Sequence, residues 1–92
     1  MAALSHPDVQ ETVIREIVTS IPLPEGIKLQ RLEFRNDSTD DPALFLTYSI
    51  DESLKSDDEW VQDLSALTQA TRRRLRDMDV SLFPYLHFVA AQ

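Results

Sequence analysis

The sequence predicts an α+β domain of order α-β-β-α-β, with two helices packed on one face of a small three-stranded sheet. Two segments carry apolar residues at three- and four-residue spacing, which is typical of amphipathic helices. Three others carry the alternating or β-rich apolar runs that indicate strands. With 92 residues, of which 42% are apolar, we expect a single domain over residues 1–92 with one modest core.

The first helix is expected over Leu4–Ile21. Ser5 and Asp8 have capping-box spacing, and Leu4 and Val9 flank that cap as a hydrophobic staple would. The apolar stripe consists of Val9, Val13, Ile14, Ile17, Val18 and Ile21. The segment IPLPEG should end this helix, because its two prolines lack amide donors and Gly26, the single glycine of the chain, is a turn former.

Two strands are expected over Ile27–Arg35 and Ala43–Ile50, joined as a hairpin by the turn-forming segment NDSTDD (36–41). The second strand alternates with period two and places its apolar side chains on one face.

The first strand changes phase partway along. Ile27 and Leu29 lie on one phase, and Leu32 and Phe34 lie on the other. A β-bulge near Gln30 would bring both pairs to the same face.

A second helix should follow the capping box SDDE (56–59). Its apolar side chains fall within an arc of about 120° on a helical wheel. They are Trp60, Val61, Leu64, Leu67, Thr71, Leu75 and Met78. A last strand is expected over Val80–Val89, and Pro84 restricts it to a sheet edge or a bulge because proline donates no ladder hydrogen bond.

Four arginines stand near the end of the second helix: Arg72, Arg73, Arg74 and Arg76. None points into the apolar arc. One interpretation is structural: they offset the negative end of the helix dipole and pair with acids of the 36–41 loop, which should lie at the same pole. The other is functional: Arg72, Arg73 and Arg76 bind phosphate or an acidic partner, since the guanidinium fork suits such anions.

The segment from Asp37 to Asp63 holds nine acidic residues and a single lysine, a net charge of −8 in a chain whose total is −7. Its acids are interpreted either as helix caps and solvated surface or as a docking surface for a basic partner. In the second interpretation Asp57, Asp58 and Glu59 attract the partner and the ring of Trp60 anchors it.

Composition argues against enzymes and nucleic-acid binding. The chain has no cysteine, so thiolate zinc sites and cysteine nucleophiles are excluded. Its two histidines, His6 and His87, have no metal-ligand spacing, and no glycine-rich phosphate loop is present. We therefore expect no catalytic residue, metal or cofactor. Neither a signal peptide nor a membrane-length apolar run is visible, so a cytoplasmic location is expected.

The segment ALTQATRRRLRDMDVSLFPYLHF (66–88) resembles the final helix and strand of the ribosome-binding factor A family, which has a KH-like fold. That resemblance implies binding to the small ribosomal subunit, with Arg72, Arg73 and Arg76 contacting phosphate. The chain departs from the family in being strongly acidic and in lacking glycine in the helix interruption. It also lacks the GxxG loop of ordinary KH domains.

The segments DSTDDPALFLTYS (37–49), RRRLRD (72–77) and FPYLHF (83–88) are similar to those of a group of short bacterial αββαβ proteins. This resemblance implies an antitoxin or accessory role, because genes of that group neighbour HEPN-type and other toxin-like proteins. The leading hypothesis is therefore a non-catalytic acidic module that docks a basic protein. The alternative is a KH-like RNA- or ribosome-associated factor.

A third hypothesis concerns the last strand. As an exposed edge, residues 80–89 could add a strand from a partner or from a second copy, with Phe83, Tyr85 and Val89 forming an outward patch. The opposing interpretation is that Pro84 protects this edge against pairing.

Overall fold

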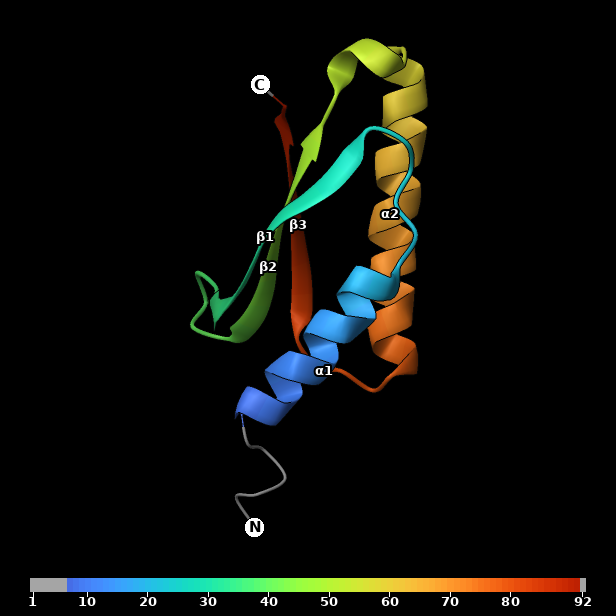
Figure 1. Ribbon diagram of the computed structural model, residues 1–92. Coiled ribbons are helices and arrows are strands. Elements are labelled where there is room, and N and C mark those ends of the chain that lie inside the picture. Colours follow the sequence, from blue (N-terminus) through green and yellow to red (C-terminus); the bar gives the residue numbers. More distant parts are fainter. Residues whose placement is uncertain (1–6, 92) are drawn as a thin grey trace.

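The computed structural model describes residues 7–91, with side chains from Glu11 onward, and confirms the predicted fold class (Figure 1). The elements are α1 (Pro7–Ser20), β1 (Ile27–Asn36), β2 (Pro42–Ile50), the short 3-10 helix η2 (Glu52–Leu54), α2 (Asp57–Asp77) and β3 (Phe83–Ala90). The expected cap at Ser5 and Asp8 and the staple at Leu4 and Val9 lie outside the described side chains.

The sheet has the order β1-β2-β3, so β2 is central and the other two strands are edges. β1 pairs with β2 in antiparallel fashion, as a hairpin must, whereas β3 pairs with β2 in parallel. The parallel pair requires a crossover, and α2 supplies it by running back along the sheet (Figure 1). Of the two arrangements that Pro84 allowed, a sheet edge or a bulge, β3 has the edge position and pairs with β2 without a bulge.

The predicted bulge in β1 is present. The register shifts between Leu29 and Arg31, which leaves Gln30 as the extra residue opposite β2. The Gln30 amide donates a 2.9 Å hydrogen bond to the Ser49 hydroxyl of β2. The bulge lets both halves of β1 turn their apolar side chains toward the helices.

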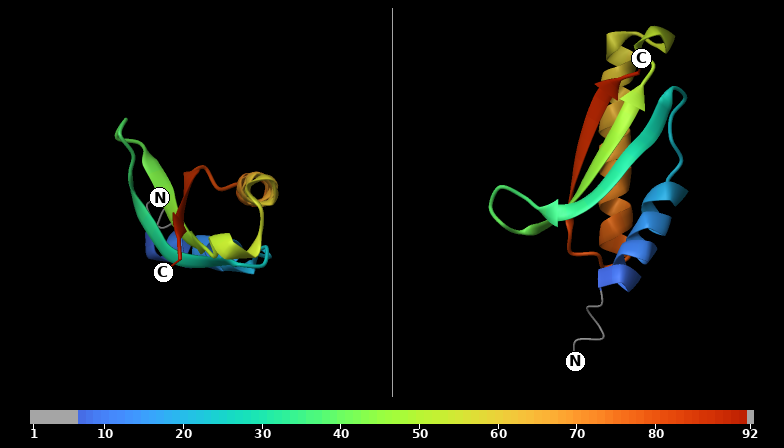
Figure 2. Two further views of the ribbon diagram at one scale, coloured as in Figure 1. Left: turned by 90° about the horizontal axis from the view of Figure 1, so that it is seen from above. Right: turned by 60° about the vertical axis from the view of Figure 1, so that its left-hand side comes forward.

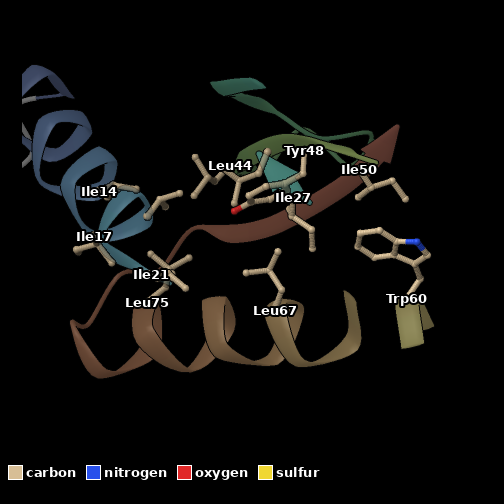
Figure 3. Packing of buried hydrophobic residues seen from close by; sticks show 12 residues of the cluster. Ile14, Ile17, Ile21, Ile27, Leu44, Tyr48, Ile50, Trp60, Leu67 and Leu75 are labelled. Atoms are coloured by element: carbon tan, nitrogen blue, oxygen red, sulfur yellow. The ribbon is translucent and has the colours of Figure 1, made fainter. Parts of the chain in front are cut away.

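The core lies between one face of the sheet and the two helices (Figure 3). Leu44, Leu46 and Tyr48 of β2 are 0–1% exposed and form its centre. Helix α1 contributes Ile14, Ile17 and Val18, and α2 contributes Trp60, Leu67, Thr71 and Leu75. Both helices thus pack on the same face, as predicted.

Three side chains assigned to the apolar stripes are exposed instead. Val13 in α1, Val61 near the start of α2 and Met78 at its end are 43%, 66% and 53% exposed. Val13 and Val61 lie at the angular margins of their stripes, and Met78 follows the last residue of α2. The buried residues of α2, Trp60, Leu67, Thr71 and Leu75, span about 80° of the helical wheel, which is narrower than the predicted arc.

The last strand begins later than predicted. Residues 80–82 form the connection from α2, and regular pairing starts with Phe83 opposite Ala43. A left-handed residue, Asp79 with φ of 60°, ends the helical region, and the Val80 amide closes the turn on the Leu75 carbonyl at 2.9 Å. A left-handed residue often follows the last turn of a helix, and the turn that it forms here is the reason that β3 begins only at Phe83.

Candidate partner-binding face

One face of the sheet is left open by the helices of the described chain (Figure 2). Because side chains alternate along a strand, the residues out of phase with the core residues Leu44, Leu46 and Tyr48 face this side. They are Lys28, Arg31, Glu33 and Arg35 of β1, Ala43, Phe45, Thr47 and Ser49 of β2, and Phe83, Tyr85, His87 and Val89 of β3. We call this set the open face. Ala43 and Ser49 are covered by their neighbours on this face and are themselves buried.

Three aromatic rings of the open face form a continuous row. Phe45 stacks on Tyr85 with ring centroids 5.0 Å apart and an interplanar angle of 14°. Tyr85 in turn meets Phe83 edge-to-face at 4.8 Å. The register explains the row, because Phe45 lies directly opposite Tyr85 and the small Ala43 lies opposite Phe83.

An arginine closes each end of this row. The guanidinium carbon of Arg35 lies 3.7 Å from the ring centroid of Phe45. That of Arg72, which comes from α2, lies 5.1 Å from the ring centroid of Phe83. Both are cation–π contacts. We call these five residues, Arg35, Phe45, Tyr85, Phe83 and Arg72, the arginine–aromatic strip.

The hairpin loop fixes one ring of the strip. The Tyr85 hydroxyl donates a 2.9 Å hydrogen bond to Oδ2 of Asp37. The other oxygen of Asp37 accepts from the Thr39 hydroxyl at 2.7 Å and from two backbone amides of the loop. The Thr39 hydroxyl and these further donors lower the pKa of Asp37 from 3.8 to about 2, because each of them stabilises the carboxylate. The hydrogen bond to Asp37 raises the pKa of Tyr85.

The open face is cationic although the chain is acidic. Lys28, Arg31 and Arg35 are exposed along β1, and the single acid among them is Glu33, which lies 3.7 Å from Arg35. A ligand of this face therefore meets apolar rings bordered by positive charge. An acid of the hairpin loop, Asp37, reaches this face at Tyr85.

The acidic residues 57–59 lie at the start of α2, at the far end from the hairpin loop (Figure 1). Asp57 and Asp58 are exposed in the first turn. Glu59 closes the predicted capping box, because its side chain accepts from the Ser56 amide at 3.0 Å and its own amide donates to the Ser56 hydroxyl. This backbone hydrogen bond from Ser56 is the main cause of the lowered pKa of Glu59.

Trp60 corrects one expectation from the sequence. Its side chain is only 5% exposed, and its ring is part of the core (Figure 3). The indole N–H donates to the Glu52 carbonyl at 3.3 Å, and the ammonium of Lys55 lies 4.8 Å from the ring centroid. Lys55 also pairs with Asp63. The ring closes the core beside Gly26 and is therefore not an exposed anchor for a partner.

The arginines of α2 do not converge on one surface. Arg72 and Arg76 line an open pocket of about 330 Å³ at the connection to β3. Arg73 and Arg74 line another of about 210 Å³ beside the end of α1. No ion pair joins any of them to the hairpin-loop acids within the described residues. Asp37 is bound to Tyr85 instead.

Sequence reasoning named Tyr85, Phe83 and Arg72 but missed Arg35 and Phe45. Phe45 stands inside the apolar run ALFL, whose composition alone does not distinguish the core side from the open side. Its partner Tyr85 becomes visible only when β3 is known to lie beside β2 in parallel register. The period-two alternation around Phe45 is the one signal in the sequence that could have found it.

Other kinds of site find no support in residues 7–91. No group of three or more histidines and acids in this range could hold a metal ion. No helix among these residues is both long and apolar enough to cross a membrane. Comparisons with protein-family models, curated proteins and solved structures give no match to this chain.

Proposed function

We propose that this chain is a non-catalytic protein-interaction module that docks its partner on the open face of the sheet. The arginine–aromatic strip is the observation that carries the proposal. Tyrosine and arginine are enriched among the residues that dominate binding energy at protein interfaces. Here Tyr85 and Phe83, 39% and 46% exposed, stand in a row of rings that has an arginine at each end.

The rings are held in place before any partner arrives. Phe45 lies between Arg35 and Tyr85, and the hydroxyl of Tyr85 is bound to Asp37. A preorganised ring loses little side-chain entropy on binding, so more of its contact energy contributes to affinity. Since Lys28 and Arg31 continue the positive charge along β1, the partner surface that fits is apolar with an acidic border.

The same geometry favours a protein over single-stranded nucleic acid. Bases stack on free aromatic faces, whereas both faces of Phe45 are covered by Arg35 and Tyr85. Trp60 is buried and the Glu59 side chain is engaged in the helix cap, so we place the partner on the open face and not on the acidic start of α2. Of the acidic surface expected there, Asp57 and Asp58 remain exposed to attract a basic partner.

The test is affinity capture with the tagged chain from its native host, with and without RNase, followed by a binding titration with the captured protein. The strip variant is Arg35→Glu combined with Phe83→Ala, because both side chains are exposed and outside the core. Arg73→Glu is the matched control, with the same charge change on the outer side of α2. Asp57→Lys with Asp58→Lys tests the acidic surface.

We expect the strip variant to weaken binding at least about tenfold, which corresponds to about 1.4 kcal/mol, and Arg73→Glu to leave binding unchanged. A loss of binding only in the Asp57→Lys and Asp58→Lys variant would replace the open face with the acidic surface. Capture of RNA or ribosomal subunits that RNase abolishes would favour the nucleic-acid alternative. Circular dichroism of each variant verifies that the fold is retained.

A further inference from the structure

We propose that two copies of this chain pair through the free edge of β3, antiparallel to one another about Phe88, to form one continuous six-stranded sheet. This contact uses the edge of the sheet, whereas the proposed partner docks on its open face. The right view of Figure 2 shows β3 at one side of the sheet, and among residues 7–91 it has a neighbouring strand, β2, on its inner side only.

The register identifies which backbone groups of β3 are free. The Ala91 amide donates to the Ile50 carbonyl of β2 at 2.7 Å, and the pairing from Phe83 to Ala90 has no bulge. Backbone groups alternate in direction along a strand, so odd-numbered residues of β3 face β2. Leu86, Phe88 and Ala90 therefore turn their N–H and C=O groups to the free edge.

Pro84 fits the same pattern. As an even-numbered residue it turns its nitrogen to the free edge, where the missing N–H costs β3 no bond to β2. It also removes a donor from this edge and so marks where pairing must stop. The usable edge is Leu86–Ala90, which lies beyond both Pro84 and the Arg72 side chain that packs on Phe83.

The two edges of the sheet differ in how they resist pairing. β1 carries Lys28, Arg31, Glu33 and Arg35 and is bent by the bulge at Gln30, and both devices discourage strand addition. β3, with the sequence FPYLHFVA, has no Asp, Glu, Lys or Arg and no bulge, and its protection is limited to Pro84. The half of β3 beyond Pro84 thus presents unprotected edge groups.

Charge and symmetry point to a second copy as the occupant. Two chains of net charge −7 repel each other, but no Asp, Glu, Lys or Arg occurs between Val80 and Ala91, so the copies meet here without opposed charges. Pairing β3 with the charged, bulged β1 of another copy would be head-to-tail and open-ended. Pairing β3 with β3 is two-fold and closed, which is the commonest form of homodimer.

The free groups also define the register. With Phe88 on the two-fold axis, Leu86 lies opposite Ala90 of the second copy, and Leu86, Phe88 and Ala90 exchange about six backbone hydrogen bonds across the interface. Pro84 lies outside this paired stretch. On the open face, His87 lies opposite Val89 of the second copy, because directly opposed residues share a face.

The test is sedimentation of the wild-type chain from low micromolar to about millimolar concentration, where we expect the mass to rise from monomer to dimer. Ala90→Pro removes an edge donor that makes no bond to β2, and it should lower dimer affinity at least about tenfold. His87→Lys with Val89→Lys places like charges directly across the axis and should abolish the dimer. Gln62→Lys with Ser65→Lys is the matched control, since it adds the same charge on exposed positions of α2.

A pair of variants with opposite charges tests the register. A copy with His87→Glu and Val89→Glu should be monomeric alone and should form a mixed dimer with the lysine copy. A wild-type chain that stays monomeric at every concentration would overturn the proposal. So would a dimer that is insensitive to both edge variants, or a failure of the lysine and glutamate copies to combine.

Discussion

The hydroxyl of Tyr85 in the edge strand donates a 2.9 Å hydrogen bond to the carboxylate of Asp37 in the hairpin loop, 48 residues earlier in the chain. This bond ties β3 to a loop with which it has no strand pairing. It also sets the orientation of the central ring of the arginine–aromatic strip. A single carboxylate thereby organises the loop and positions a residue of the proposed binding surface.

The first prediction concerns the pKa of Asp37. NMR titration of its carboxyl group in the wild type should give about 2, against an ordinary value of 3.8. Tyr85→Phe should raise this pKa partway, and Thr39→Val should raise it further because the Thr39 hydroxyl has the largest lowering effect. An Asp37 that titrates near its ordinary value in the wild type would show that the loop hydrogen bonds do not persist in solution.

The direction of the pH effect follows from the same shift. Because the folded state lowers the pKa of Asp37, it favours the ionised carboxylate. The ionised carboxylate therefore stabilises the fold, and this stabilisation is complete above about pH 3.8. It is lost as the pH falls from there toward 2. Asp37→Asn should remove this part of the acid dependence of unfolding, and it should lower the raised pKa of Tyr85 in a spectrophotometric titration.

The second prediction is that Gly26→Ala destabilises the fold by about 1–3 kcal/mol. Gly26 has φ of 90°, and a Cβ there would lie 2.9 Å from Cδ1 of Leu54 and 3.1 Å from Cη2 of Trp60. Urea unfolding measures the loss. Adding Leu54→Ala should recover only the part due to that flexible side chain, since the backbone strain and the contact with the buried indole persist.

The third prediction separates two apolar residues of α2 that the sequence placed on the same stripe. Leu67→Ala should lower the free energy of unfolding by about 2–5 kcal/mol, because a 3% exposed leucine leaves a cavity. Val61→Ala should change it by no more than about 0.5 kcal/mol, because that side chain is 66% exposed. Equal losses in chemical denaturation would contradict the burial described for this helix.

The fourth prediction is that Ser56→Ala lowers stability by about 1 kcal/mol. The Ser56 hydroxyl accepts from the Glu59 amide at 3.3 Å, and its loss leaves that amide to water. Ser65→Ala, at an exposed position in the middle of the same helix, is the matched control and should be neutral or slightly stabilising. Thermal unfolding of the pair isolates the cap from the general effect of removing a serine.

The local chemistry of the chain was sufficient to predict most of the fold. The capping box at Ser56 and the phase change at Gln30 each indicated one local backbone arrangement, and Pro84 narrowed the last strand to a sheet edge or a bulge. The margins of the helical stripes were not predictable in this way. Val61 and Met78 are apolar residues at helical spacing, but Val61 lies at the angular edge of its stripe and Met78 follows the last residue of α2, and both remain exposed.

The candidate site was less accessible from the sequence because it is built across strands. Tyr85 was identifiable as an outward residue from alternation, but its neighbours Phe45 and Asp37 depend on strand order and register. Trp60 failed for the opposite reason. A large aromatic residue beside acids suggested a surface anchor. Its ring instead packs into the core, where Gly26 leaves room for it because glycine has no Cβ.

The bulge in β1 has a consequence for how this domain tolerates insertions and deletions. Without Gln30 the strand would alternate regularly from Ile27 to Phe34, with every apolar residue on the side that it occupies now. Losing one residue from a strand ordinarily exchanges its two faces, but here it would preserve them and cost mainly the local bend and the bond to Ser49. Among homologues of this chain we therefore expect β1 to vary in length at this one position, while the core and the hairpin loop stay unchanged.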